Sequence, residues 1–229
     1  MRRLGLIGGM SAESTAIYYR EINRLVRDRL GGLHSAELVL WSVDFAPIAA
    51  WQAADDWDAT GAALAEAARR LEGAGAEAIL ICANTMHINA AQVQAAIGVP
   101  LIHIADATAA ALKARGVARP LLLATRYTME KPFYRERLAA LGLPCLVPDD
   151  AERDRLQAII FDELVKGVIT ADAKAAALAM IETGKAAGAD SVIFGCTEIG
   201  MLLDPAELDL PAVDTAIVHC EAAVEFALG

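Results

Sequence analysis

Two stretches of the chain decide its fold: Gly75-Ala-Glu-Ala-Ile-Leu-Ile-Cys-Ala-Asn-Thr85 and Gly188-Ala-Asp-Ser-Val-Ile-Phe-Gly-Cys-Thr197. Each opens with Gly-Ala and an acidic residue, continues as an apolar run and ends in small polar residues. Short apolar runs without polar alternation are typical of strands covered on both faces of a parallel sheet. A second apolar run, opened by Pro100 or Pro211, follows each stretch. The repeat therefore predicts two similar halves.

The rest of the chain extends this pattern. Leu4–Met10 and Leu121–Met129 begin the two halves in a similar way, and helical patterns lie between the apolar runs. We predict an α/β fold of two pseudosymmetric parallel-sheet halves, residues 1–116 and 117–229, in which the C-terminal helix can return to the first half. Ligands of open α/β sheets bind at the carboxyl ends of the strands, so the active site is expected between the halves.

Composition excludes several classes of partner. The chain has 229 residues and a formal net charge of −10, with no basic run. Nucleic acid and anionic membranes are therefore not expected as partners. Four cysteines without a CxxC pair argue against a disulfide framework and for a reducing compartment. The apolar start is too short for a signal peptide, and no run of about 18 apolar residues exists, which leaves the cytoplasm as the expected location.

Familiar cofactor and metal motifs are absent from the sequence. Gly5-Leu-Ile-Gly-Gly-Met-Ser11 does not meet the dinucleotide pattern GxGxxG, and no Walker loop, GxSxG or HExxH is present. His34, His103 and His219 lie far apart in the sequence and predict no metal cluster. We therefore expect neither a metal nor another cofactor.

Cys196 is the main candidate for chemistry. It follows a predicted strand and precedes Thr197 and Glu198 at the start of a short helix. Backbone N–H groups at such a turn lower the pKa of a thiol and can bind an anion, which favours a thiolate base or nucleophile. A buried structural cysteine is the alternative, since that is the commoner fate of a single cysteine.

The matching turn in the first half is Ala83-Asn-Thr-Met-His87. Asn84 and Thr85 can donate to a carboxylate or simply shape the turn and cap the helix. His87 fits packing better than catalysis. The substrate-binding candidates lie at predicted strand ends or in neighbouring segments, and they are Met10, Ser11, Gln52, Ala83, Asn84, Thr85, Thr125, Lys166, Thr197 and Glu198.

The two turn motifs together resemble the aspartate/glutamate racemase family, in particular its bacterial branch of broad-specificity amino-acid racemases. The likeness continues through motifs spread over nearly the whole chain: Gly8-Gly-Met-Ser11, His34-Ser-Ala36, Ser42-Val-Asp-Phe45, Thr125-Arg-Tyr-Thr-Met-Glu130 and Asp214-Thr215. The resemblance implies a homodimer that racemises small amino acids without pyridoxal phosphate. It also implies two opposed thiols, one on each face of the substrate Cα, and fixed donors that stabilise the enediolate.

The chain departs from this pattern at one position. The first thiol of the family precedes the Asn-Thr pair, where this chain has Ala83, and Cys82 lies one residue earlier. Adjacent strand residues point to opposite faces, so Cys82 is expected to face away from the pocket. Three alternatives follow: racemisation by Cys196 with a water or a displaced Cys82 as partner, one-thiol chemistry of the decarboxylase kind, or ligand binding without turnover.

Overall fold

The chain folds as two compact units. The computed structural model describes residues 1–229. Met1–Ile104 and His219–Gly229 form the first unit, and Ala105–Val218 form the second. The division comes ahead of the predicted boundary after residue 116, because helix α5 (Ile104–Ala114) packs within the second unit. There Arg137 Nε donates to Asp106 Oδ1 at 2.6 Å, and Thr108 Oγ1 lies 3.2 Å from Tyr134 Oη.

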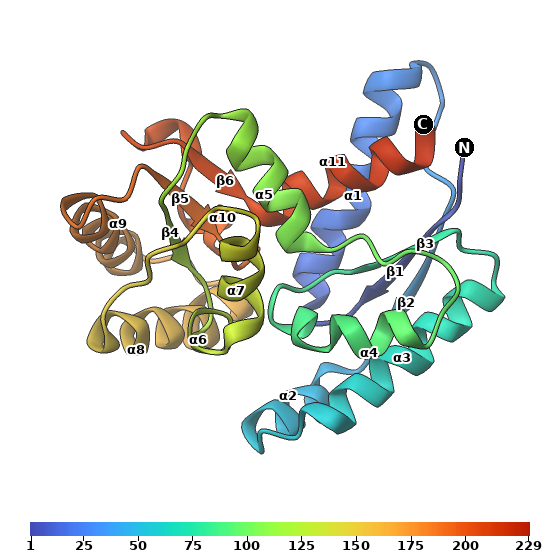
Figure 1. Ribbon diagram of the computed structural model, residues 1–229, viewed down its shortest axis with the longest axis horizontal. Coiled ribbons are helices and arrows are strands. Elements are labelled where there is room, and N and C mark those ends of the chain that lie inside the picture. Colours follow the sequence, from blue (N-terminus) through green and yellow to red (C-terminus); the bar gives the residue numbers. More distant parts are fainter. The chain divides into compact units, whose positions relative to one another are not determined.

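The first unit is built on a parallel sheet of three strands in the order β2-β1-β3 (Figure 1). The strands are β1 (Leu4–Gly8), β2 (Leu38–Ser42) and β3 (Ala78–Ile81). A single parallel bridge between Ile79 and Leu101 adds a further position beyond β3. The predicted strand near residue 101 is therefore reduced to one bridge.

The second unit repeats this arrangement. Its parallel sheet has the order β4-β5-β6, from β4 (Pro120–Leu123), β5 (Ser191–Phe194) and β6 (Ala212–Asp214). A single bridge between Leu121 and Leu146 adds a position beyond β4. With the bridges included, the segment at Leu146 corresponds to β2, β4 to β1, β5 to β3, and β6 to the segment at Leu101. The two parallel α/β halves predicted from the repeat are confirmed.

The start of the repeated stretch makes the same contact in both units. Arg3 N donates to Glu77 Oε1 at 2.9 Å, and Arg119 N donates to Asp190 Oδ1 at 3.0 Å. In the second unit the glycine before this aspartate, Gly188, has a φ of +92°, and a Cβ there would meet the Arg119 guanidinium at 2.9 Å. Glycine is thus required where the chain turns tightly against the arginine that precedes the first strand. This shared contact explains why the repeat opens with Gly-Ala and an acidic residue.

Helices connect the strands throughout. In the first unit they are α1 (Ala12–Leu30), α2 (Phe45–Ala53), α3 (Trp57–Gly73), η1 (Thr85–Asn89) and α4 (Ala90–Ala95). In the second unit, besides α5, they are α6 (Arg126–Glu130), α7 (Pro132–Ala140), α8 (Asp150–Ala158), η2 (Ile159–Glu163), η3 (Leu164–Lys166), α9 (Ala171–Ala186), α10 (Ile199–Leu202) and η4 (Pro205–Glu207). The last helix, α11 (Thr215–Leu228), begins in the second unit and ends in the first. No helix combines the length and the apolar character needed to cross a bilayer.

Apolar side chains explain why these helices pack on the sheets. In the first unit, Leu64, Ala68 and Leu71 of α3 join Ile7 and Ile79 of the sheet in one buried cluster. Small alanines let the helix approach the strands closely, and each fully buried aliphatic side chain contributes roughly 1.5–3 kcal/mol. Ser11 caps α1, since its Oγ accepts a hydrogen bond from Ser14 N at 3.2 Å. The packed sheet and the cap together fix the strand ends where the candidate residues lie.

Candidate functional site

Cys196 lies in the turn between β5 and α10, where its thiol contacts a buried carboxylate. Its Sγ donates to Glu198 Oε2 at 2.9 Å, and Thr197 Oγ1 donates to the same oxygen at 2.7 Å. Cys196 is 9% exposed and Glu198 is 4% exposed. The turn therefore holds a thiol and a carboxylate together, largely out of water.

The expected lowering of the Cys196 pKa is wrong for this structure. Burial raises the pKa of Cys196 well above its ordinary value, and the negative charge of Glu198 and its hydrogen bond from the thiol raise it further. The backbone N–H of Glu198 does lower the Cys196 pKa, as the sequence argument assumed, but burial and the Glu198 carboxylate outweigh it. The resting group is a protonated thiol with a proton acceptor beside it.

Asp214 adds a second negative charge to this region. It ends β6, and its Oδ1 accepts hydrogen bonds from Ala216 N at 2.9 Å and Ile217 N at 3.3 Å, as a cap of α11. Its charge also raises the pKa of Cys196, after the larger effects of burial and Glu198. A Cβ on Gly200 would come within 2.3 Å of Asp214 Oδ2, so α10 needs glycine to pack here. The acidic surroundings of the thiol favour a ligand that carries a positive charge near the reacting atom.

The corresponding turn of the first unit offers no accessible thiol. Cys82 is 0% exposed, and its backbone N donates to Ile7 O at 2.9 Å, which continues the pairing of β3 with β1. Burial raises the pKa of Cys82 far above its ordinary value. Ala83 is partly exposed, as is Thr85, whereas Asn84 is buried. The partly exposed side chains at this strand end are thus the Ala83 methyl group and the Thr85 side chain, and neither carries a thiol.

Further predicted residues of the first unit lie around the same strand ends. Met10 is 7% exposed and belongs to the core cluster, and Ser11 caps α1. Gln52 of α2 is 6% exposed, and its Nε2 contacts Met86 Sδ of η1 at 2.9 Å. The structure therefore brings Gln52 against the helix that follows Ala83. Met10 and Gln52 also have packing roles that the sequence did not indicate.

The predicted site residues of the second unit differ from one another in exposure and in the contacts they make. Thr125 is 8% exposed and caps α6, with its Oγ1 accepting from Thr128 N at 3.4 Å. Arg126, a neighbouring cation, forms ion pairs with Glu130 and Asp154. The Lys166 side chain is 61% exposed, and its Nζ lies 3.7 Å from Asp162 Oδ1. Of these two cations, Lys166 has the looser pairing and is the better candidate for binding a carboxylate.

Of His34, His103 and His219, which were expected to be scattered, His103 and His219 both lie beside His87 in the first unit. The ring centroids of His87 and His103 lie 4.6 Å apart, and those of His87 and His219 lie 5.7 Å apart. Tyr18 Oη lies 2.8 Å from His219 Nδ1. Sequence separation hid this cluster, because its members come from α1, η1, the segment before α5, and α11. No three His, Cys, Asp or Glu side chains are arranged to hold a metal ion.

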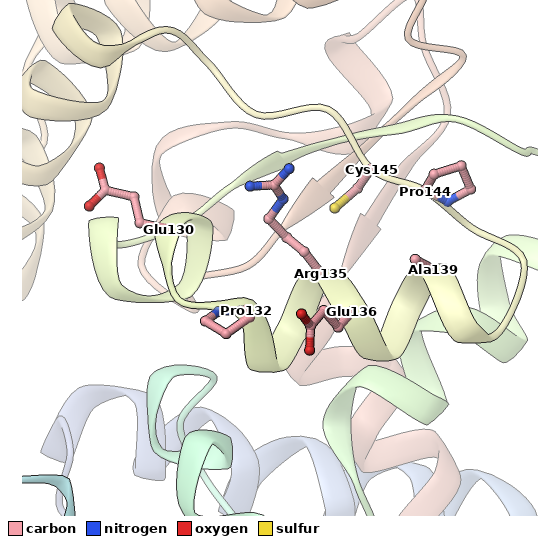
Figure 2. A pocket seen from close by; sticks show the side chains of 7 residues that line it. All are labelled: Glu130, Pro132, Arg135, Glu136, Ala139, Pro144 and Cys145. Atoms are coloured by element: carbon pink, nitrogen blue, oxygen red, sulfur yellow. The ribbon is translucent and has the colours of Figure 1, made fainter.

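A surface pocket of about 330 Å³ lies elsewhere in the second unit, between α6, α7 and the segment before Leu146 (Figure 2). In Figure 2 the Cys145 sulfur is directed toward the Arg135 side chain. Burial raises the pKa of Cys145, although the nearby Arg135 charge opposes this effect. The residues that line the pocket include none of the predicted site residues, so this pocket is separate from the strand-end turns.

Comparison with known proteins identifies relatives along the whole chain. A model of the Asp/Glu/hydantoin racemase family matches residues 7–223. RacX of Bacillus subtilis (strain 168), a broad specificity amino-acid racemase, is 21% identical over 227 residues, which are 96% of each chain. A Yersinia pestis protein assigned as an Asp/Glu racemase is 47% identical, with a TM-score of 0.94 over 100% of both chains. An aspartate racemase homologue from Pyrococcus horikoshii OT3 is 34% identical, with a TM-score of 0.88 over 100% of both chains.

Proposed function

Because this chain belongs to the Asp/Glu/hydantoin racemase family and is similar to named amino-acid racemases, we propose that it racemises small amino acids with the Cys196 thiol as a proton carrier. The proposal includes chemistry without pyridoxal phosphate. The single observation that carries it is the buried contact of 2.9 Å between Cys196 Sγ and Glu198 Oε2. Family membership supplies the reaction class, and the contact supplies a group that can both give and take a proton.

Proton transfer at Cα requires Cys196 to act in two directions. As an acid, the thiol donates its proton directly to the carbanion. As a base, it must first lose that proton, and Glu198 Oε2 is placed to accept it. The Thr197 hydroxyl donates to the same oxygen at 2.7 Å and stabilises the carboxylate while it is charged. The Cys196 thiol and the Glu198 carboxylate thus share one proton, which is bound either to Sγ or to Oε2.

Substrate charge helps this step. The pKa of Cys196 is raised by burial and by the negative charges of Glu198 and Asp214. The ammonium group of a bound amino acid brings a positive charge to the atom next to the reacting carbon. Such a charge lowers the thiol pKa and favours transfer of the proton to Glu198. Amino acids are therefore better substrates for this thiol than simple carboxylic acids.

Racemisation also needs a second proton carrier, which exchanges a proton with the other face of the substrate Cα. Ala83 has no proton to give, and Cys82 is 0% exposed with a raised pKa. We propose that water serves the opposite face, which makes racemisation slow relative to exchange of the Cα proton. Ala83 also favours a second candidate, one-thiol chemistry that protonates a single face after loss of carbon dioxide.

Deuterium exchange separates these functions. Aspartate, glutamate and neutral amino acids are incubated in deuterium oxide, and Cα exchange and product chirality are followed. We expect exchange with slow racemisation, lost in Cys196→Ala and retained in the matched control Cys82→Ala. Activity should survive hydroxylamine treatment, which removes pyridoxal phosphate. Carbon dioxide released from an arylmalonate without any amino-acid exchange would establish the second candidate, and exchange that persists in Cys196→Ala would contradict both.

Substrate range is tested at Lys166. If its exposed ammonium binds the distal carboxylate of acidic amino acids, Lys166→Met should raise the KM for aspartate and glutamate and leave that for alanine unchanged. Lys174, paired with Glu207 at 2.5 Å, offers a control lysine in the same unit. Equal effects of Lys166→Met on aspartate and alanine would remove Lys166 from the site.

A further inference from the structure

Two successive carbonyl groups at the end of β3 are each bound by a buried side chain. Ser14 Oγ donates to Cys82 O at 3.0 Å, and His87 Nδ1 lies 2.8 Å from Ala83 O. Both side chains are 2% exposed. A carbonyl oxygen only accepts, so the hydrogen bonds fix the direction of the peptide groups on both sides of Ala83.

The hydrogen bonds also fix the tautomer of His87. Its Nδ1 faces the Ala83 carbonyl and must carry the proton. Its Nε2 accepts from Ile104 N at 3.2 Å and must be bare. Burial and the neighbouring His103 and His219 lower the pKa of His87 well below its usual value, in agreement with a neutral ring.

A second imidazole supports the first. His219 Nε2 lies 2.8 Å from Ile102 O and must donate to it, so His219 Nδ1 accepts from the Tyr18 hydroxyl at 2.8 Å. Burial lowers the pKa of His219 to about 4. The segment 102–104 therefore accepts a hydrogen bond from His219 at Ile102 O and donates one to His87 from Ile104 N. The backbone of residue 83 is connected to α1 and α11 through side chains that stay neutral near pH 7.

Because the peptide group is planar, these contacts also set the directions of the Ala83 and Asn84 N–H groups. In a trans peptide the C=O and N–H groups point in opposite directions. Because the Cys82 carbonyl points at Ser14, the Ala83 N–H points away from Ser14. Because the Ala83 carbonyl points at His87, the Asn84 N–H points away from His87. The two N–H groups are thereby preset without any movement when a ligand arrives.

We propose that Ser14 and His87 are positioning residues that aim the main-chain N–H groups of Ala83 and Asn84 at the carboxylate of the substrate. This inference rests on the proposed racemase function. The carboxylate gains negative charge when Cα loses its proton, and preset N–H donors stabilise that charge without reorganisation. His87 acts through the backbone and exchanges no proton with the substrate.

Variants of His87 separate its two hydrogen bonds. His87→Asn places an amide N–H where Nδ1 lies and retains the bond to Ala83 O. His87→Gln can retain the acceptor for Ile104 N but loses the donor to Ala83 O. His87→Phe keeps the ring and loses both bonds. Ser14→Ala removes the other carbonyl contact.

The measurements are kcat and KM for amino-acid exchange, together with the thermal midpoint of each variant. We expect kcat/KM to fall at least tenfold in His87→Gln, His87→Phe and Ser14→Ala, since a misplacement of about 1 Å can cost about 10²-fold. His87→Asn should stay within about threefold of the wild type by the same geometric argument. A purely structural His87 would give activities that follow thermal stability, with His87→Asn no better than His87→Phe, and that result would overturn the inference.

Two readouts do not depend on turnover. Nitrogen-15 spectra of the wild type should show His87 with a protonated Nδ1 and a bare Nε2. Binding of 2-aminoisobutyrate and 2-methylaspartate, which have a carboxylate but no Cα–H, should weaken in His87→Gln and not in His87→Asn. This binding pattern in a protein that exchanges no amino acid would reject the racemase function and keep the positioning role. Equal binding by all variants, or none by the wild type, would reject the positioning role.

Discussion

Glu198→Gln tests whether the carboxylate beside Cys196 receives a proton or only adjusts the thiol. In the structure Glu198 Oε2 accepts from Cys196 Sγ at 2.9 Å and from Thr197 Oγ1 at 2.7 Å. Glutamine has nearly the same size and keeps one acceptor oxygen, but it has no charge and cannot take up a proton. Thr197→Val is the matched control, because it removes the second hydrogen bond and leaves the carboxylate.

The two roles of Glu198 predict changes of opposite sign at neutral pH. Burial is the largest cause of the raised Cys196 pKa and remains in the variant, whereas the charge and hydrogen bond of Glu198 are lost. The thiol pKa therefore falls, and a larger share of Cys196 is thiolate at any pH below it. If Glu198 only raised that pKa, Glu198→Gln would be more active near pH 7. If Glu198 receives the proton, the variant loses the contribution of a general base, about 10²–10⁴-fold in rate.

We expect the loss. The assay is Cα exchange in deuterium oxide over the range in which thiols ionise, roughly pH 6 to 10. Alkylation by iodoacetamide in a Cys145→Ala background reports the thiolate fraction of Cys196 separately. Slower exchange together with faster alkylation would establish Glu198 as the proton acceptor. Exchange at pH 7 equal to or above the wild-type rate would refute the reasoning, and a similar loss in Thr197→Val would assign the effect to the hydroxyl.

Three further predictions concern the first strand end and the repeated contact. Ala83→Cys restores a proton donor at a partly exposed position and should raise the ratio of racemisation to exchange by about 10²–10⁴-fold, as measured by product chirality; an unchanged ratio would mean that water already suffices. Cys82→Ala should leave exchange unchanged and lower the unfolding free energy by about 1 kcal/mol in urea titration, because the thiol is fully buried but unused. Asp190→Asn should destabilise the fold at pH 7 by about 1 kcal/mol after allowance for solvent. Burial opposes ionisation of Asp190, but N–H groups of Ala118 and Arg119 lower its pKa below 3.8, so this difference should vanish as the pH falls through the lowered value.

The sequence was sufficient to predict features that depend on neighbours in the chain. The apolar runs placed the strands of both sheets. The comparison of the two halves also showed that Cys82 lies one residue before the position expected for a thiol. Because neighbouring residues of a strand point to opposite faces, this shift changes the direction of its side chain. The side chain of Cys82 was expected to face away from the pocket, and it is 0% exposed.

Features that depend on the path of a side chain were beyond the sequence. Burial raises the pKa of Cys196 most, and the Glu198 side chain that folds back onto the sulfur raises it further; no spacing rule specifies that contact. The contact between His87 and His219 joins residues far apart in the chain. One local signal was present, because His87 lies four residues after Ala83 and can reach its carbonyl within a single helical turn.

The two halves show how one supersecondary unit can support two kinds of chemistry. Both use the same strand order and the same contact between an arginine backbone and an acidic side chain, so the end of β3 and the end of β5 are equivalent places. At the end of β5 the side chains carry the reactive groups, a thiol and a carboxylate. At the end of β3 the position of the thiol holds the methyl group of Ala83, and buried side chains bind the backbone carbonyls of residues 82 and 83. If the N–H groups of residues 83 and 84 bind the substrate carboxylate as proposed, the first half contributes to the reaction without a thiol at residue 83, because main-chain donors need no particular side chain there.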